Sequence, residues 1–113
     1  MNLSASHCVP CRGDVAPLSA QKEDQFLKEV RGWKISRDGT HRISKEFTFD
    51  SFEAGIEFVN RVAELAEREG HHPDMHVSYK HVVIELQTHT IKGLSETDFI
   101  MAAKIDELQK VSV

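Results

Sequence analysis

Histidine is the residue type in this 113-residue chain whose spacing most strongly indicates chemistry. Five of the seven histidines fall between positions 71 and 89: His71, His72, His76, His81 and His89. The imidazole side chain gains and loses its proton near neutral pH, and it is also a common metal ligand. The cluster therefore predicts either acid–base catalysis or metal binding.

Three of these histidines are expected where a rigid helix and a strand meet accessible loops. Glu67 falls in the last turn of a predicted helix, and His71 and His72 follow its expected stop at Gly70. His89 follows the last predicted strand. If the two strands before His89 pair, the helix end and the loop face one cleft. Imidazoles gathered there would suit proton transfer to and from an uncharged substrate.

Purely structural roles explain many of the same residues. A histidine pair after a helix can be a solvated cap that interacts favourably with the helix dipole, and Glu67 can be a solvated helix residue. Asp98 fits a capping box that begins at Ser95. Tyr79, at the end of an alternating strand, is expected in the core. Exposed strand positions beside neighbouring charges are expected for His41, His76 and His81.

Metal binding is the competing interpretation. His71, His72, Asp74 and His76 offer nitrogen and oxygen ligands. The chain has no HExxH motif, and no two histidines lie four residues apart on a predicted helix, as they do in a zinc-binding helix. Adjacent side chains such as those of His71 and His72 point in different directions. We therefore expect no metal site.

The N-terminal segment carries a CxxC motif, Cys8-Val-Pro-Cys11. One CxxC is half of a structural zinc site, and the chain has no second pair. A thioredoxin-type role requires a βαβ context, which this segment does not offer. Because Pro10 and Gly13 interrupt it, we expect a flexible, inert arm over residues 1–17 and a single domain over residues 18–113.

Charge and hydropathy argue against several classes of function. Lys and Arg number 14 and Asp and Glu number 18, a net charge of −4. An acidic balance disfavours a nucleic-acid binder, because phosphate contacts need clustered basic residues. No apolar run reaches the roughly 20 residues of a membrane span, and the N-terminus lacks a secretion signal. We therefore expect a cytoplasmic protein.

Apolar periodicity predicts the elements that must position these residues. Helices alternate with pairs of strands, and a long helix separates the second strand from the third. The simplest two-layer arrangement is an α+β sandwich, in which three helices cover one face of a four-stranded sheet. The expected helices span residues 20–30, 50–69 and 95–109, and the expected strands span residues 33–35, 41–49, 75–79 and 82–86.

The helix predicted over residues 50–69 is apolar over more of its circumference than packing on one sheet face requires. A buried subunit interface would account for the surplus. Its two apolar stripes are Phe52, Ile56, Val59, Ala63 and Ala66, and beside them Phe58, Val62 and Leu65.

The spaced polar residues form one extended pattern, Glu67-x3-His71-His72-Pro73-x5-Tyr79-x9-His89-x8-Asp98. Shorter segments surround it, including Asn60-Arg-Val-Ala63 and Gly93-Leu-Ser-Glu-x-Asp98. The pattern resembles the signature of the pterin-4a-carbinolamine dehydratases, also called 4a-hydroxytetrahydrobiopterin dehydratases. The resemblance runs from about Leu18 to Leu108 and leaves out the CxxC arm.

This resemblance implies a small α+β fold with an antiparallel sheet, assembled into homodimers or homotetramers. It implies loss of water from 4a-hydroxytetrahydropterin to give quinonoid dihydropterin, which recycles the cofactor of aromatic amino acid hydroxylases. It implies no metal or organic cofactor.

The resemblance also implies roles for individual residues. His71 and His89 would be the acid and the base, in an order left open. His72 would bind and orient the pterin, and Glu67 would orient an imidazole. The other implied residues are Thr88, Gly70 and Gln87, which would line the pterin edge, and Asp98, Pro73 and Met75, which would shape the site.

Two alternatives to pterin recycling stay open. One is a dehydratase-like protein of molybdopterin metabolism. The other is a non-catalytic coactivator, because some animal members of the family bind a homeodomain transcription factor. The intact histidines favour an enzyme, since a binding module does not need them. Met75 stands where animal members carry an aromatic residue, so the preferred pterin side chain is left open.

Overall fold

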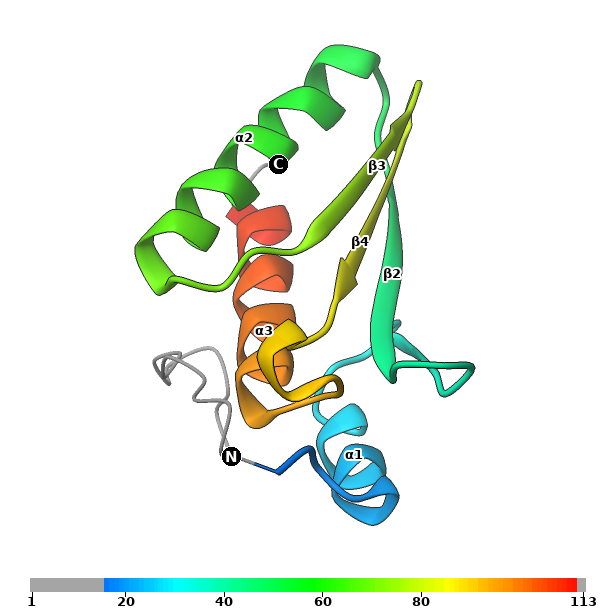
Figure 1. Ribbon diagram of the computed structural model, residues 1–113. Coiled ribbons are helices and arrows are strands. Elements are labelled where there is room, and N and C mark those ends of the chain that lie inside the picture. Colours follow the sequence, from blue (N-terminus) through cyan, green and yellow to red (C-terminus); the bar gives the residue numbers. More distant parts are fainter. Residues whose placement is uncertain (1–15, 112–113) are drawn as a thin grey trace.

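The computed structural model describes residues 16–111, with the side chains of residues 89, 110 and 111 left out. The Cys8–Cys11 motif lies outside the described residues. Helices and strands follow each other in the expected order (Figure 1). They are α1 (Ala20–Leu27), β1 (Lys34–Ser36), β2 (Arg42–Thr48), α2 (Phe52–Glu69), β3 (Asp74–Ser78), β4 (His81–Leu86), the 3-10 turn η2 (His89–Ile91) and α3 (Glu96–Val111).

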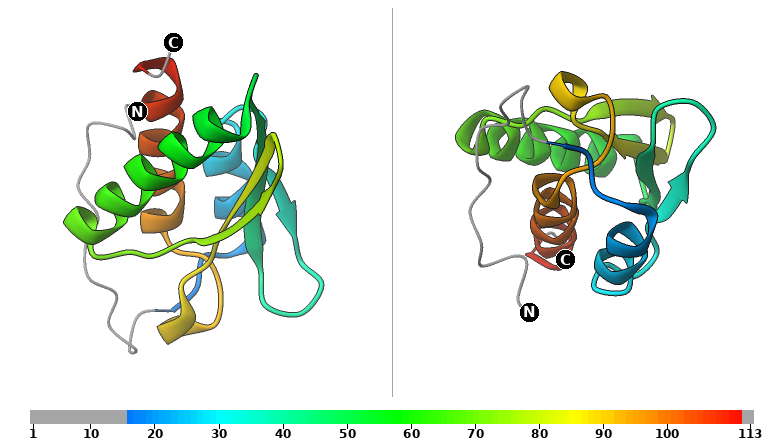
Figure 2. Two further views of the ribbon diagram at one scale, coloured as in Figure 1. Left: turned by 90° about the horizontal axis from the view of Figure 1, so that it is seen from above. Right: turned by 60° about the horizontal axis from the view of Figure 1, so that its bottom comes forward.

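The four strands form one antiparallel sheet in the order β1-β2-β4-β3. On the central strands β2 and β4, alternate residues face the helices. The buried residues of this face are Ile43, Phe47, Val82, Ile84 and Leu86. The helices cover this one face of the sheet, as the two views of Figure 2 show. The predicted α+β sandwich is confirmed. No helix in the described part of the chain is long and apolar enough to cross a bilayer.

The N-cap of helix α2 lies one residue later than the sequence predicts, and the helix ends where expected. Its N-cap is Ser51, not Asp50, because the Ser51 hydroxyl accepts the N–H of Ala54 at 3.1 Å. At the other end, Gly70 adopts the left-handed conformation, with φ at 69°. The N–H groups of Gly70 and His71 both donate to the carbonyl of Ala66, which fixes the chain where it leaves the helix.

The two apolar stripes of α2 face different surroundings. Phe58, Val62 and Leu65 are buried in the core, whereas Phe52, at the start of the other stripe, is 48% exposed. Ile56 and Val59 are half-buried. The start of the Phe52 stripe therefore lies at the surface, whereas Val59 packs against the core and Ala66, at the other end of the stripe, is buried in it.

Two other expectations were wrong. Tyr79 is 67% exposed, because the pairing of Ser78 with His81 makes residues 79 and 80 the hairpin turn. Helix α1 ends at Leu27, three residues early, and the turn that follows lets Val30 and Trp33 enter the core.

A buried carboxylate attaches α1 to the β1–β2 hairpin. The Glu23 side chain is 1% exposed and accepts hydrogen bonds from Arg37 Nε at 3.0 Å. Its other oxygen lies 2.8 Å from His41 Nδ1. Arg37 also donates to Asp24. The hydrogen bonds to Asp24 and to Glu23 raise the pKa of Arg37, and the one to Asp24 has the larger effect.

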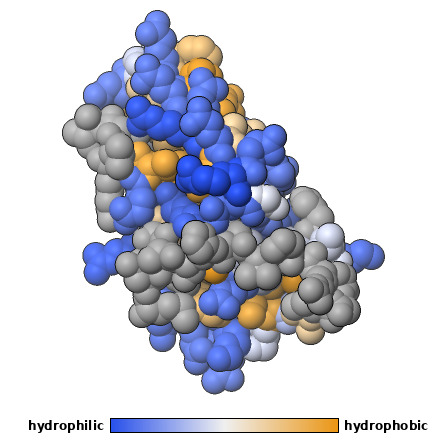
Figure 3. Space-filling model, turned by 90° about the vertical axis from the view of Figure 1, so that its left-hand side faces the viewer, coloured by the Kyte–Doolittle hydropathy of each residue, from blue (hydrophilic) through white to orange (hydrophobic). Residues whose placement is uncertain are grey.

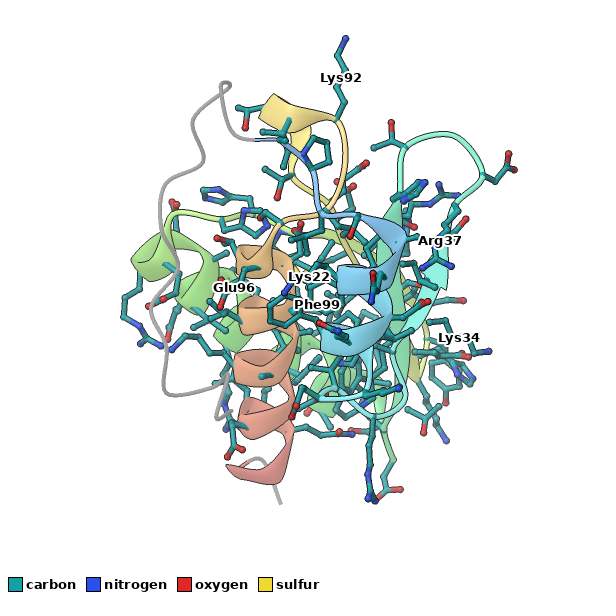
Figure 4. The ribbon with its side chains drawn as sticks, turned by 90° about the horizontal axis from the view of Figure 1, so that it is seen from below. Lys22, Lys34, Arg37, Lys92, Glu96 and Phe99 are labelled. Carbon is teal, nitrogen blue, oxygen red and sulfur yellow. The ribbon has the colours of Figure 1, made fainter. Side chains whose placement is uncertain are left out.

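Two buried apolar residues flank the start of helix α3: Leu94 lies just before it and Phe99 lies in it. This is the staple that the sequence predicts. The Phe99 ring stacks on Phe26 of α1, with centroids 5.5 Å apart. Figure 4 shows Phe99 pointing inward and Lys92, in the preceding loop, projecting away from the molecule.

Candidate active site

Asp98 is the fixed point of the candidate site. It lies in the first turn of α3 and is fully buried. Its Oδ2 accepts the backbone N–H of Ser95 at 2.9 Å and the hydroxyl of Thr88 at 2.7 Å. Its Oδ1 lies 2.6 Å from Nε2 of His71. The carboxylate thus caps the helix with one oxygen and holds an imidazole with the other.

His71 reaches Asp98 from the end of α2. Its backbone is held by the Gly70 cap, and its side chain is 12% exposed. An ionised carboxylate only accepts hydrogen bonds, so Nε2 of His71 carries a proton when Asp98 is ionised. In the neutral imidazole, Nδ1 is then the nitrogen without a proton. This arrangement suits a histidine that exchanges protons with a substrate.

Thr88 connects the end of β4 to the same carboxylate. Its backbone N–H donates to Gly93 at 2.8 Å, which closes the loop that contains η2. Its hydroxyl contacts both Asp98 and the hydroxyl of Ser95, the latter at 3.0 Å. His89 is the first residue of η2, and its side chain lies outside the described part of the structure.

His72 and Glu67 form a separate pair. Nε2 of His72 lies 2.7 Å from Oε2 of Glu67, and the two side chains are 63% and 78% exposed. An exposed pair of this kind is screened by water and contributes little to stability. The acid predicted to orient an imidazole therefore contacts His72, whereas Asp98 contacts His71.

The remaining predicted residues surround these contacts. Gly70 precedes His71 and provides the turn out of α2, and Pro73 is half-buried just before β3. Gln87 is half-buried between β4 and Thr88. Met75 pairs with Ile84 in the sheet and packs against the core.

Sequence reasoning missed two features of the site. Asp98 was expected mainly to shape the site through its capping position, and its contact with His71 was not predicted. The N–H of Ser95 donates to Asp98 as the predicted capping box requires, but the contact of the Ser95 hydroxyl with Thr88 is not predicted. The available signal was the match of Asp98 to the family pattern, because a capping acid alone looks the same in sequence.

Two other histidines contact acids elsewhere in the fold. His81 lies 2.9 Å from Glu46 on the exposed side of the sheet, which confirms its predicted position beside a charge. His41 was expected to be exposed on a strand, but it precedes β2 and is half-buried against Glu23 of α1, and His76 is exposed on β3. Among the side chains that the structure describes, which leave out His89, no three of His, Cys, Asp or Glu gather as a metal site would require.

Known proteins resemble this chain over most of its length. The family model "Pterin 4 alpha carbinolamine dehydratase" matches residues 16–108. A Halorhodospira halophila protein, whose name assigns it provisionally to the pterin-4-alpha-carbinolamine dehydratases, is 45% identical over 96% of this chain and 98% of its own length. The Arabidopsis thaliana "Pterin-4-alpha-carbinolamine dehydratase 2, mitochondrial" is also 45% identical, over 96% of this chain and 59% of its own length.

Two solved structures share the fold. A "transcriptional coactivator/pterin dehydratase" from Brucella melitensis has a TM-score of 0.77 and 28% identity, over 81% of this chain and 97% of its own. A "pterin dehydratase-like protein", described as a RuBisCO assembly factor in the alpha-carboxysome, has a TM-score of 0.60 and 26% identity, over 69% and 89%. By its sequence and its fold, this chain belongs to the pterin-4a-carbinolamine dehydratase family.

Proposed function

We propose that the chain dehydrates a 4a-hydroxytetrahydropterin to the quinonoid dihydropterin by histidine acid–base catalysis. The observation that carries the proposal is the contact between His71 and the buried carboxylate of Asp98, at 2.6 Å. A carboxylate in this position fixes the orientation of the imidazole and, because it accepts the Nε2–H, also its tautomer. Both effects favour a histidine that moves a proton during the reaction.

The reaction needs two proton transfers. The C4a–O bond breaks, and the departing hydroxide takes a proton from an acid and leaves as water. The electron pair that replaces the bond comes from a neighbouring ring nitrogen, which loses its proton to a base. Each well-placed proton transfer accelerates such a step by about 10²–10⁴-fold.

Residue roles follow from the family pattern and from the contacts. His71, held by Asp98, is one proton-transfer group, and His89, on η2, is proposed as the other. His72, paired with Glu67 at the surface, binds the pterin edge, together with Thr88, Gly70 and Gln87. The proposed pathway is recycling of the hydroxylase cofactor in the cytoplasm, and molybdopterin metabolism is the alternative.

A stopped-flow assay with chemically prepared 4a-hydroxytetrahydropterin tests this proposal. Wild type is expected to exceed the buffer rate, and His71→Ala and His89→Ala should each lose about 10²-fold or more in kcat. His81→Ala is the matched control, because His81 lies on the exposed side of the sheet against Glu46. A wild-type rate equal to that of buffer would reject the enzyme and favour a binding role, such as those named for the two solved structures.

We also propose that the chain forms homo-oligomers through an apolar end surface, made of Phe52, Ile56, Val77 and Tyr79. Three of these residues are exposed large hydrophobics, at 48%, 41% and 67% for Phe52, Val77 and Tyr79. Phe52 and Ile56 lie at the start of α2, and Val77 and Tyr79 lie at the end of β3 and in the β3–β4 turn. Figure 1 shows these two parts of the chain side by side, and the Phe49 N–H donates to the Lys80 carbonyl between them. A hollow of about 300 Å³ is lined by Phe52 and Ile56, with Glu53 and Glu57.

A second copy of the chain suits this surface. β3 is an edge strand, so its outer backbone groups lack a neighbouring strand and can pair with another one. Figure 3 shows hydrophobic residues between hydrophilic ones on the side of the molecule that includes α2. Phe52→Glu is expected to shift the mass measured by light scattering toward the monomer. Lys34→Glu, at the opposite edge of the sheet, should leave it unchanged, and a monomeric wild type would reject the proposal.

A further inference from the structure

Pro17, just before α1, lies against Gly93 in the loop between β4 and α3. A Cβ atom added to Gly93 would lie 2.8 Å from Cβ and 3.2 Å from Cγ of Pro17. The backbone does not require glycine here, because the described glycines with positive φ are Gly32, Gly39 and Gly70. The close approach of Pro17 therefore explains why residue 93 has no side chain.

A second contact holds the same segment to the same loop. The N–H of Leu18 donates to the carbonyl of Leu94 at 2.8 Å, and the Leu18 side chain packs against the core. Figures 2 and 4 show the segment that leads into α1 running alongside the loop before α3. We call Pro17 and Leu18 the strap.

The strap contacts the loop at Gly93, which is hydrogen-bonded to a residue of the site, Thr88. Gly93 exchanges two backbone hydrogen bonds with Thr88, at 2.8 and 3.4 Å. The Thr88 hydroxyl donates to Asp98 at 2.7 Å, and Asp98 contacts His71 at 2.6 Å. A displacement of Gly93 would therefore move Thr88 and, through the buried carboxylate, the imidazole.

We propose that the strap is a positioning element of the active site. The contact of Pro17 with Gly93 keeps Thr88 where it can hold Asp98 against His71. The kinetic consequence rests on the proposed function, whereas the structural consequence at His71 does not. A contact that only stabilised the fold would change the free energy of unfolding and leave the His71 ring as it is.

Substitutions at Gly93 and Pro17, made singly and together, test the proposal. Gly93→Ala forces the added methyl group against Pro17 and should lower kcat by about 10- to 100-fold. The Nε2–H signal of His71 in a ¹⁵N-labelled sample should shift and exchange faster with water, because its short hydrogen bond is disturbed. Adding Pro17→Gly should restore both readouts, because the methyl group added at position 93 then occupies the space of the removed Pro17 atoms and keeps the two segments in contact. Adding Pro17→Ala should restore less, because it keeps Cβ.

Gly55→Ala is the matched control. Gly55 is also buried, and its added Cβ would lie 3.5 Å from Phe49 and Val82, which are ordinary contacts. This variant should leave the rate and the His71 signal unchanged.

Several results would overturn the strap. Gly93→Ala with an unchanged His71 signal would do so, and so would a disturbed signal that Pro17→Gly does not restore. If Gly93→Ala fails to fold, the single variant Pro17→Gly tests the proposal, because it removes the contact without adding atoms. Faster exchange of the His71 Nε2–H would then support the positioning role of the strap, and unchanged exchange would reject it. If wild type does not dehydrate the pterin, the proposed function fails, while the His71 signal still tests the strap.

Discussion

Oδ1 of Asp98 lies 2.6 Å from Nε2 of His71, although the two residues are 27 positions apart in sequence. The contact joins the first turn of α3 to the end of α2. Because Asp98 is fully buried and its other oxygen accepts two hydrogen bonds, the imidazole takes its position from a rigid group. This relationship leads to the first two predictions.

Asp98→Asn should abolish most of the activity. The amide keeps the volume of the carboxylate but removes its negative charge and places an N–H₂ group where His71 now finds an acceptor. We expect kcat to fall by about 10²–10⁴-fold. Asp106→Asn is the control: Asp106 also lies on α3 and accepts hydrogen bonds from Lys45 and Trp33, far along the helix. It should lower stability with little effect on kcat, and equal kinetic losses in both variants would contradict the prediction.

Thr88→Val should weaken both the fold and the site. Valine keeps the shape of threonine but leaves Asp98 and Ser95 without the hydroxyl that contacts them at 2.7 and 3.0 Å. A lost buried hydrogen bond of this kind costs about 1–3 kcal/mol in the free energy of unfolding, measurable by urea titration. Thr88→Ser keeps the hydroxyl and should retain most of the activity. A Thr88→Val protein as stable as wild type would show that the hydroxyl contributes nothing.

Gly70→Ala should destabilise the exit from α2. Apart from its own chain neighbours, the added Cβ has no atom within 4 Å, so the cost comes from the left-handed backbone at φ 69°. We expect a loss of about 1 kcal/mol in thermal or chemical unfolding. Gly70→Asn should cost less, because asparagine adopts this conformation more readily than alanine. Equal losses for Ala and Asn would argue against a conformational cause.

Glu23→Gln should destabilise the fold without affecting catalysis. The change weakens two hydrogen bonds from Arg37 and His41 to a buried carboxylate, at a cost of about 1–3 kcal/mol. Asp24→Asn is the matched control, since the Asp24 side chain is 60% exposed and shares the same Arg37. It should have a much smaller effect on the unfolding midpoint. A loss of kcat in Glu23→Gln would contradict the separation of this cluster from the site.

Local patterns in the sequence predicted most of the fold. Alternation in β2 and β4, the stop at Gly70 and the staple of Leu94 and Phe99 are all determined by neighbouring residues. The errors occurred where two local signals compete. Asp50 and Ser51 can both cap α2, and Tyr79 continues the alternation of β3 although the strand register makes it a turn residue.

The family pattern, most of the helices and strands, and the set of polar residues that could act can all be predicted from the order of the amino acids. Which acid contacts which histidine depends on the packed fold: Glu67 contacts the exposed His72, whereas buried Asp98 contacts His71. The same packing buries the stripe of Phe58 on α2 and leaves Phe52 at the surface. The physical reason is that periodicity records only local geometry. The distance between the end of α2 and the start of α3 depends on how both helices pack against the sheet.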